Sequence, residues 1–149
     1  MTRKEKALKL FQEDFNCAQS VLTSFSEELG LTEDQTMSLG VCFGGGMRKG
    51  EVCGAVSGAM MVIGLKYGQG GSSARDYKEK SYPKGREFMD RFKEKNGSCL
   101  CKEILGCNIS TQEGMKQAEK KNLFHEICPK LVASAVDILE EDILQAETK

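Results

Sequence analysis

Seven cysteines are the residues of this sequence with the clearest potential for chemistry. They occur in a chain of 149 residues, and a single histidine, His125, accompanies them. In an oxidising compartment such usage is typical of a disulfide scaffold, whereas in a reducing one it indicates metal binding or redox chemistry. Residues 1–15 contain no apolar run of the kind that a secretory signal needs. We therefore expect a cytoplasmic protein whose cysteines serve metal or redox chemistry.

Four of the cysteines stand at or near predicted helix starts: Cys17, Cys53, Cys101 and Cys128. Each lies within three residues of a residue that favours a helix N-terminus, namely Asn16, Gly50, Ser98 and Pro129. The unpaired amides and the macrodipole at such a position stabilise a thiolate over a thiol. Thiolate is the form that attacks disulfides and binds metals, so these four are the candidate catalytic residues and, alternatively, the candidate metal ligands.

The remaining cysteines, Cys42, Cys99 and Cys107, are interpreted first as buried or incidental thiols. Cys99 has a second interpretation, as a resolving thiol or a spare ligand beside Cys101. His125 precedes Cys128 by three residues, so on a continuous helix it would share a face with that thiol and act as its base or ligand partner. The alternative for His125 is a polar surface residue.

Several common kinds of site are absent from the sequence. There is no Cys-x-x-Cys, which excludes a thioredoxin-type dithiol and a zinc ribbon, and one histidine is too few for a zincin. No Gly-x-Ser-x-Gly occurs, and the glycine triplet at 44–46 lacks the Lys-Ser/Thr of a phosphate-binding loop. A net charge of -1 provides no excess of positive charge for binding nucleic acid. The most apolar run, 52–65, is too short for membrane insertion.

The elements that must position these cysteines are predicted to be helices throughout. Helical periodicity dominates, and alternating β-branched runs are nearly absent. We expect a single domain over 1–149, an all-α compact bundle of about six to eight helices. The expected helices cover 3–13, 17–30, 32–42, 50–67, 72–80 with a kink or new helix from Pro83 to 95, 99–105, and the tail from 111 onward.

The segment from Gly50 to Tyr67 is apolar nearly all round, so we expect it to be the central helix. Gly54 and Gly58, with an alanine after each, place small residues at a four-residue spacing. Glycine inside a helix costs about 1 kcal/mol relative to alanine. Two of them indicate that another backbone or a compact cofactor approaches closely, and both are candidate cofactor-binding residues.

Several segments of the chain resemble a known family. They are 15–19 (Phe-Asn-Cys-Ala-Gln), 43–47 (Phe-Gly-Gly-Gly-Met), 53–58 (Cys-Gly-Ala-Val-Ser-Gly) and 101–106 (Cys-Lys-Glu-Ile-Leu-Gly), with Cys128 beyond. In order and spacing they are similar to the C_GCAxxG_C_C family of redox-active proteins, over about residues 7–140. The resemblance implies Cys17, Cys53, Cys101 and Cys128 as the family's four cysteines. Because the family is associated with oxidoreductase and transporter loci, it also implies an oxidoreductase or a transporter-associated protein as partner.

Three functions remain open from the sequence. The first is a redox-active protein whose dispersed cysteines carry out thiol–disulfide or electron-transfer chemistry, as an oxidoreductase or as its accessory partner. The second is a four-cysteine centre holding a metal ion or an iron–sulfur cluster. The third is a structural or interaction module with inert buried cysteines. The cofactor, if there is one, and the oligomeric state are left open.

Overall fold

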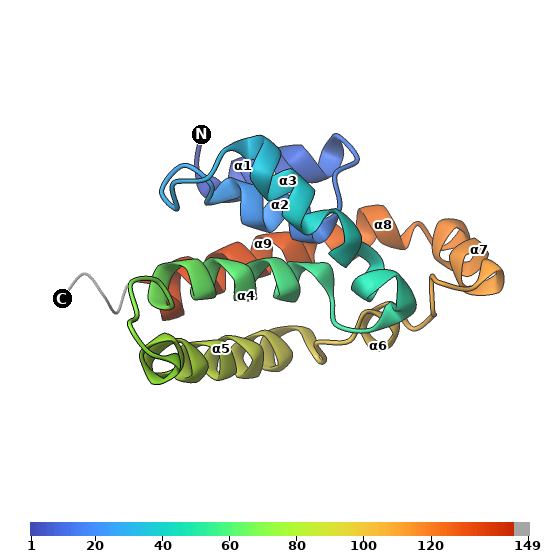
Figure 1. The fold of residues 1–149 in the computed structure, drawn as a ribbon. Helices are drawn as coiled ribbons and strands as arrows, with labels where there is room; N and C mark the ends of the chain where they lie inside the picture. Colours follow the sequence, from blue (N-terminus) through green and yellow to red (C-terminus); the bar gives the residue numbers. More distant parts are fainter. Residues whose placement is uncertain (145–149) are drawn as a thin grey trace.

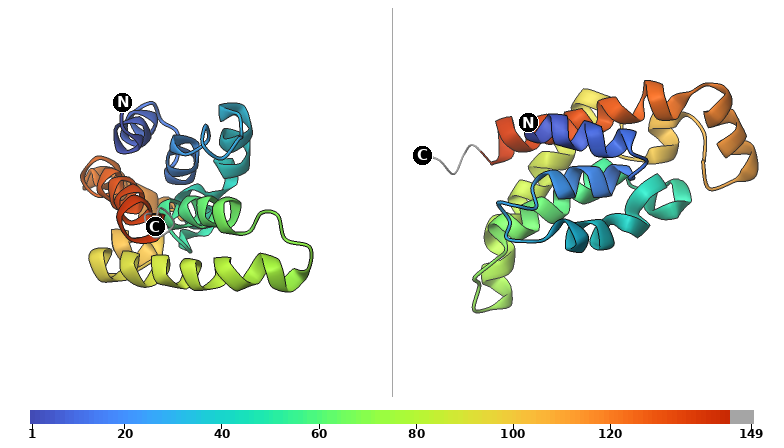
Figure 2. Two further views of the ribbon diagram at one scale, coloured as in Figure 1. Left: turned by 90° about the vertical axis from the view of Figure 1, so that its left-hand side faces the viewer. Right: turned by 90° about the horizontal axis from the view of Figure 1, so that it is seen from above.

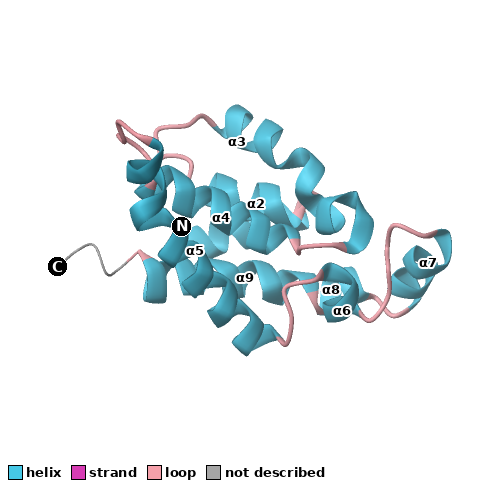
Figure 3. Ribbon diagram, turned by 60° about the horizontal axis from the view of Figure 1, so that its bottom comes forward, coloured by secondary structure: helices cyan, strands magenta, loops and turns pink. Residues whose placement is uncertain are grey.

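The computed structural model describes residues 1–144, and in this part of the chain the structure is all-α (Figures 1 and 3). The helices in chain order are α1 (Arg3–Gln12), α2 (Cys17–Ser24), α3 (Glu33–Gly40), α4 (Gly54–Tyr67), α5 (Ala74–Asn96), α6 (Cys101–Leu105), α7 (Gln112–Lys120), α8 (Leu123–Glu126) and α9 (Cys128–Ile138). Three short turns of other geometry are η1 (Val41–Phe43), η2 (Gly46–Gly50) and η3 (Leu139–Ile143). The all-α fold class is thus confirmed.

The long helices form three layers (Figure 2, left). α1, α2 and α3 lie on one side, α4 and α9 run through the middle, and α5 covers the opposite side. The short helices α6, α7 and α8 gather at one end, at the right of Figure 1. Because α4 and α9 both begin near this end, their N-termini point toward the same region of the molecule.

The predicted central helix is confirmed in α4, which packs against α2, α5 and α9. Its small residues allow very close packing: a Cβ on Gly58 would lie 2.8 Å from the carbonyl oxygen of Ala18 in α2. A Cβ on Gly40, at the end of α3, would likewise lie 3.0 Å from the backbone nitrogen of Gln19. These glycines therefore let the neighbouring backbones of α2, α3 and α4 come together.

Capping boxes begin the first three helices. Thr2, Asn16 and Thr32 each accept a hydrogen bond from the backbone N–H three residues on, and the side chain of that residue accepts one from the backbone N–H of the cap. The expected caps Asn16 and Thr32 are confirmed. The expected end of α2 at Gly30 is wrong, since the helix ends at Ser24 and turns follow. The Ser24 hydroxyl donates to the carbonyl of Val21, a local bond that competes with helix continuation.

Two other predicted helix starts lie a few residues too early. α4 begins at Gly54 rather than near Gly50, and α6 begins at Cys101 rather than Cys99. The reason is an antiparallel bridge between Val52 and Leu100, in which Cys53 N–H donates to Cys99 and Cys101 N–H donates to Glu51. These backbone pairs hold both segments extended, so each helix begins only after the bridge.

Helix α5 continues through Pro83 as one helix of 23 residues, so of the two predicted alternatives at Pro83 the new helix is wrong. Pro83 is exposed, where water can satisfy the carbonyl that loses its amide partner. The C-terminal part is less regular than predicted. It is helical from Thr111 as predicted, but it is divided by Asn122, which has a left-handed φ of 57°, and again at Ile127.

The main core combines α2, α4, α5 and α9 around Phe25, Phe88 and Phe92, which are almost completely buried. A second, smaller cluster at the α6–α8 end contains Cys101, Cys107 and Cys128. No helix within residues 1–144 has the length and apolar character needed to cross a membrane.

Candidate functional site

All four sequence-predicted cysteines line one pocket at the end of the bundle that carries α6 and α8. The pocket has a volume of about 540 Å³, and Cys17, Cys53, Cys101 and Cys128 all contribute to its surface. Cys53, Cys101 and Cys128 are buried, whereas Cys17 is half-buried. The fold thus brings together thiols that the sequence separates by 36, 48 and 27 positions.

Each of these cysteines stands at the start of a different helix. Cys17, Cys101 and Cys128 are the first residues of α2, α6 and α9, and Cys53 is the N-cap of α4. The capping side chain of Asn16 also donates to the carbonyl of Val41 and so holds the start of α2 against η1. The predicted placement at helix starts is therefore confirmed for all four, although Cys53 lies at the cap rather than within the first turn.

Cys17 is the centre of the thiol cluster. Its thiol lies beside Cys53 and Cys128 and can donate its one hydrogen bond to either sulfur. Because this hydrogen bonding and burial both favour the neutral thiol, they raise the pKa of Cys17 well above its ordinary value. Cys17 therefore acts as a hydrogen-bond donor between two other sulfurs.

The pKa of Cys53 moves in the opposite direction. The hydrogen bond from Cys17 lowers the pKa of Cys53, and the backbone amides of Ala55 and Val56 at the start of α4 lower it further, against the effect of burial. Cys53 is thus the sulfur that this environment favours as thiolate, the nucleophilic form of cysteine.

Cys101 differs from the expectation that every helix start lowers a thiol pKa. Burial and the negative charge of neighbouring thiolates raise the pKa of Cys101 to about 12. α6 has only five residues, so its dipole is small, and desolvation outweighs it. The site therefore contains one favoured thiolate, Cys53, beside two thiols that favour the protonated form, Cys17 and Cys101.

A glycine-rich turn forms another side of the pocket. Gly45, Gly46, Met47 and Arg48 all have φ between 59° and 66°, so four successive residues are left-handed. A Cβ on Gly46 would lie 2.5 Å from the backbone nitrogen of Glu51 and 2.9 Å from the Cβ of Cys101. Only glycine fits there, which explains part of the triplet at 44–46.

Arg48 is a pocket residue that the sequence analysis missed. It lines the pocket, its Nη1 donates to the carbonyl of Gly44 at 3.1 Å, and its charge acts on Cys101. Nothing in the residue pattern marked it, because its place at the pocket depends on the left-handed turn. The unusual glycine content of 44–46 was the available signal in the sequence.

His125 and the three remaining cysteines differ in how they lie relative to the pocket. His125 is exposed but lines the pocket with Cys128. Cys107 is buried in the same cluster as Cys101 and Cys128, whereas Cys42 is exposed and outside the pocket lining. Cys99 lies outside the lining too, and its sulfur is 3.5 Å from the carbonyl oxygen of Met89.

The two candidate cofactor-binding glycines have packing neighbours. A Cβ on Gly54 would lie 3.0 Å from the backbone nitrogen of Ala18 and 3.2 Å from the Cβ of Cys17. Gly54 lines the pocket, whereas Gly58 faces the backbone of α2 and does not. The close approach that the sequence indicated is thus made by α2.

The grouping of potential metal ligands is a further feature of the site. Across residues 1–144, no three or more His, Cys, Asp or Glu side chains are grouped so that they could hold a metal ion. A tetrahedral zinc site or an iron–sulfur cluster requires four ligands at fixed distances. Three of the four thiols, Cys17, Cys53 and Cys128, interact with one another, and Cys101 lines the same pocket.

Comparison of the chain with curated proteins and with solved structures gives no match. Residues 15–142 match the family model described as "Putative redox-active protein (C_GCAxxG_C_C)". This range includes all four pocket cysteines, the glycine triplet and Arg48. The chain therefore belongs to the C_GCAxxG_C_C family.

Proposed function

We propose that this protein is a thiol–disulfide redox protein in which Cys53 attacks and Cys17 resolves. The single observation that carries the proposal is the position of the Cys17 thiol beside Cys53 and Cys128 within one pocket, where it can donate a hydrogen bond to either sulfur. A favoured thiolate with a protonated neighbour in contact is the arrangement that dithiol chemistry requires. Membership of a family described as redox-active supports the same reaction class.

The reaction has two steps, in which a substrate disulfide is the oxidant. First, the Cys53 thiolate attacks one substrate sulfur, so a mixed disulfide forms, the substrate S–S bond breaks, and the leaving thiolate takes a proton. Second, Cys17 loses its proton and attacks the Cys53 sulfur. The second substrate sulfur then leaves as a thiolate and is protonated. The net change is one substrate disulfide reduced to two thiols and one Cys17–Cys53 disulfide formed.

The family's association with oxidoreductases leads us to propose an oxidoreductase as the partner that returns the protein to its dithiol state. A reducing cytoplasm, which the sequence led us to expect, is the compartment in which this cycle would run.

The proposal is tested with the reduced protein and one equivalent of a small disulfide under anaerobic conditions. Free thiols are blocked with an alkylating agent, and the peptides are mapped by mass spectrometry. Two thiols per chain should be lost, and the new bridge should join Cys17 to Cys53. Cys53→Ser should abolish the reaction, and Cys17→Ser should accumulate the mixed disulfide at Cys53.

The matched control is Cys42→Ser, since Cys42 is exposed and does not line the pocket. This variant should react at the wild-type rate with one thiol fewer. Circular dichroism verifies that each variant keeps its helices. A Cys53→Ser protein that reacts normally, or a bridge that includes neither Cys17 nor Cys53, would contradict the proposal.

The metal alternative is examined in the same preparation. Metal analysis and an absorption spectrum of the anaerobically purified protein should show no thiolate-bound metal. About one metal per chain, lost when any of Cys17, Cys53, Cys101 and Cys128 is replaced, would favour the four-cysteine centre instead. Seven slowly reacting thiols without redox activity would favour the structural module.

A further inference from the structure

The pocket around the cysteines has the size and lining of a small-molecule site. Its volume of about 540 Å³ falls in the range of ligand pockets, which are mostly apolar with a few polar groups. Apolar side chains from α1, α6, α7, α8 and the α6–α7 loop line it: Phe11, Leu105, Ile109, Met115 and Phe124. A compact organic molecule with an apolar body fits such walls.

Arg48 brings a positive charge close to the sulfurs. Three residues with titratable side chains, apart from the cysteines, line the pocket: Asp14, Arg48 and His125. Of these, only Arg48 acts on a cysteine, and it lowers the pKa of Cys101 against the larger effect of burial. Asp14 and His125, which are exposed like Arg48, affect none of the three pocket thiols whose pKa is shifted.

Arg48 has donors to spare for a bound anion. A guanidinium carries five N–H groups in a planar fork that matches a carboxylate. The structure shows one of them donating to the carbonyl of Gly44, which fixes the side chain against the glycine turn. The left-handed φ of 64° at Arg48 is unfavourable for a residue with a side chain. Such strain is typical of residues that a site holds in place for function.

We propose that the pocket binds a small organic disulfide that has an apolar body and a carboxylate, and that Arg48 pairs with this carboxylate. This inference rests on the proposed function, because the bound disulfide is the substrate that Cys53 attacks. The apolar walls bind the body, Arg48 binds the carboxylate, and the disulfide is thereby held at the sulfurs of α2 and α4. Electrons and atoms balance as in the two steps above, with the carboxylate unchanged.

The test uses two probes that differ only in charge, the cyclic disulfide lipoate and its uncharged amide, lipoamide. Reduced protein is mixed with excess probe, and the single-turnover loss of protein thiols is followed as a function of probe concentration. The wild-type protein should reach half of its maximal rate at about tenfold lower lipoate than lipoamide, the effect of a charge-assisted pair worth about 1.4 kcal/mol.

Arg48→Met should raise the half-saturating concentration of lipoate about tenfold and change that of lipoamide less than twofold. Arg48→Lys should restore part of the preference, because it keeps the charge but not the fork. Lys49→Met is the matched control, since Lys49 is the adjacent exposed cation and does not line the pocket. It should leave both probes unchanged.

The outcomes distinguish this inference from the proposed function. If the wild-type protein reduces neither probe but forms the Cys17–Cys53 bridge with another small disulfide, the pocket inference is overturned while the redox function stands. If no disulfide forms that bridge, the dithiol function itself fails. If the wild-type protein reduces both probes with equal half-saturating concentrations, or if Arg48→Met affects both probes alike, the carboxylate pairing is overturned while the redox function stands. A preference for lipoate that survives in Arg48→Met would also overturn the role of Arg48.

Discussion

Cys53 and Cys101 show how differently two cysteines behave at helix starts in one pocket. The pKa of Cys53 is lowered because it accepts a hydrogen bond from Cys17 and faces the amides of α4, a helix of 14 residues. Cys101 begins a helix of five residues, so burial dominates and its pKa is raised to about 12. At the scale of single residues, hydrogen-bond partners decide the protonation state more than the position in the helix does.

The first prediction concerns the pH dependence of alkylation. In the folded, reduced protein, Cys53 should react with iodoacetamide below pH 9, whereas Cys101 should stay nearly unreactive until the pH approaches 12. The physical reason is that only the thiolate reacts, and the two pKa values lie on opposite sides of the ordinary value of 9.0. Mass spectrometry of the two peptides across a pH series measures this difference.

The control is the same experiment in concentrated urea, where both thiols should titrate near their ordinary value. Equal pH profiles in the folded protein would contradict the assignment. A linked effect on stability follows for Cys101, whose folded-state pKa is raised above its unfolded value. Its contribution to stability is complete below about pH 9.0 and is lost as the pH rises toward about 12.

At the scale of elements, the site depends on how closely α2 and α4 approach. Three of the four cysteine-bearing helices, α2, α4 and α9, have eight residues or more, and their N-termini all point into the pocket. The positive ends of their dipoles therefore converge on the sulfurs. Gly54 and Gly58 make this convergence possible, because their lack of a side chain lets the α2 backbone rest on α4.

The second prediction compares two glycines of α4. Gly58→Ala should destabilise the fold by about 1–3 kcal/mol, since the new Cβ would lie 2.8 Å from the backbone oxygen of Ala18 and α2 would have to move. Gly64→Ala in the same helix should be neutral or stabilising by up to about 1 kcal/mol, because nothing lies within 4 Å. Urea unfolding of both variants measures the contrast, and equal effects would disprove the packing argument.

Sequence patterns were informative where the physics is local. Asn16 and Thr32 could be identified as caps because the capping box joins residues only three apart. The starts of α4 and α6 could not be located, because the bridge between Val52 and Leu100 joins segments far apart in the chain. For the same reason the helix-start pattern singled out four cysteines but could not show that Cys17 touches Cys53 and Cys128. Arg48 could not be foreseen, since its direction depends on a left-handed turn.

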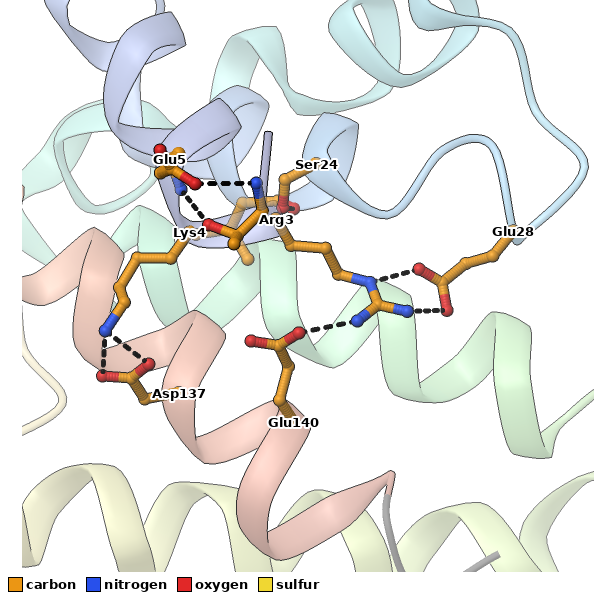
Figure 4. Close-up of polar contacts among 9 residues, drawn as sticks. Arg3, Lys4, Glu5, Ser24, Glu28, Asp137 and Glu140 are labelled. Atoms are coloured by element: carbon orange, nitrogen blue, oxygen red, sulfur yellow. Dashed lines mark hydrogen bonds and ion pairs between the residues drawn. The ribbon is translucent and has the colours of Figure 1, made fainter. Parts of the chain in front are cut away.

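At the scale of the whole molecule, the end opposite the pocket is joined by ion pairs (Figure 4). Arg3 in α1 pairs with Glu28 in the turn after α2 and, at 2.6 Å, with Glu140 in η3. Its guanidinium also lies 5.0 Å from the centre of the Phe25 ring. Lys4 pairs with Asp137 at 3.0 Å. These contacts connect the N-terminal helix with the C-terminal part of the described chain.

The third prediction is that Arg3→Met lowers the free energy of unfolding by about 1 kcal/mol at low salt. Half-exposed ion pairs contribute little individually, but Arg3 serves two carboxylates and an aromatic ring at once. In about 1 M salt the loss should shrink, because the Debye length falls to about 3 Å. Thermal unfolding at two salt concentrations measures it.

Arg75→Met is the control for this experiment. Arg75 is highly exposed, and its pair with Glu79 lies within α5, so the change should stay within about 0.5 kcal/mol. A loss at Arg3 that does not respond to salt would assign its contribution to packing on Phe25 instead of to the ion pairs.

Oxidation would also change the stability of the fold, because the pocket cysteines begin helices from different parts of the chain. A bond between Cys17 and Cys53 would close a loop of about 40 residues and tie α2 to α4 covalently, which in the chain-entropy account disfavours the unfolded state by about 4 kcal/mol. The free energy of unfolding would then rise when the disulfide forms and fall when it is reduced. The melting temperature of the protein would therefore be higher in the disulfide form than in the dithiol form.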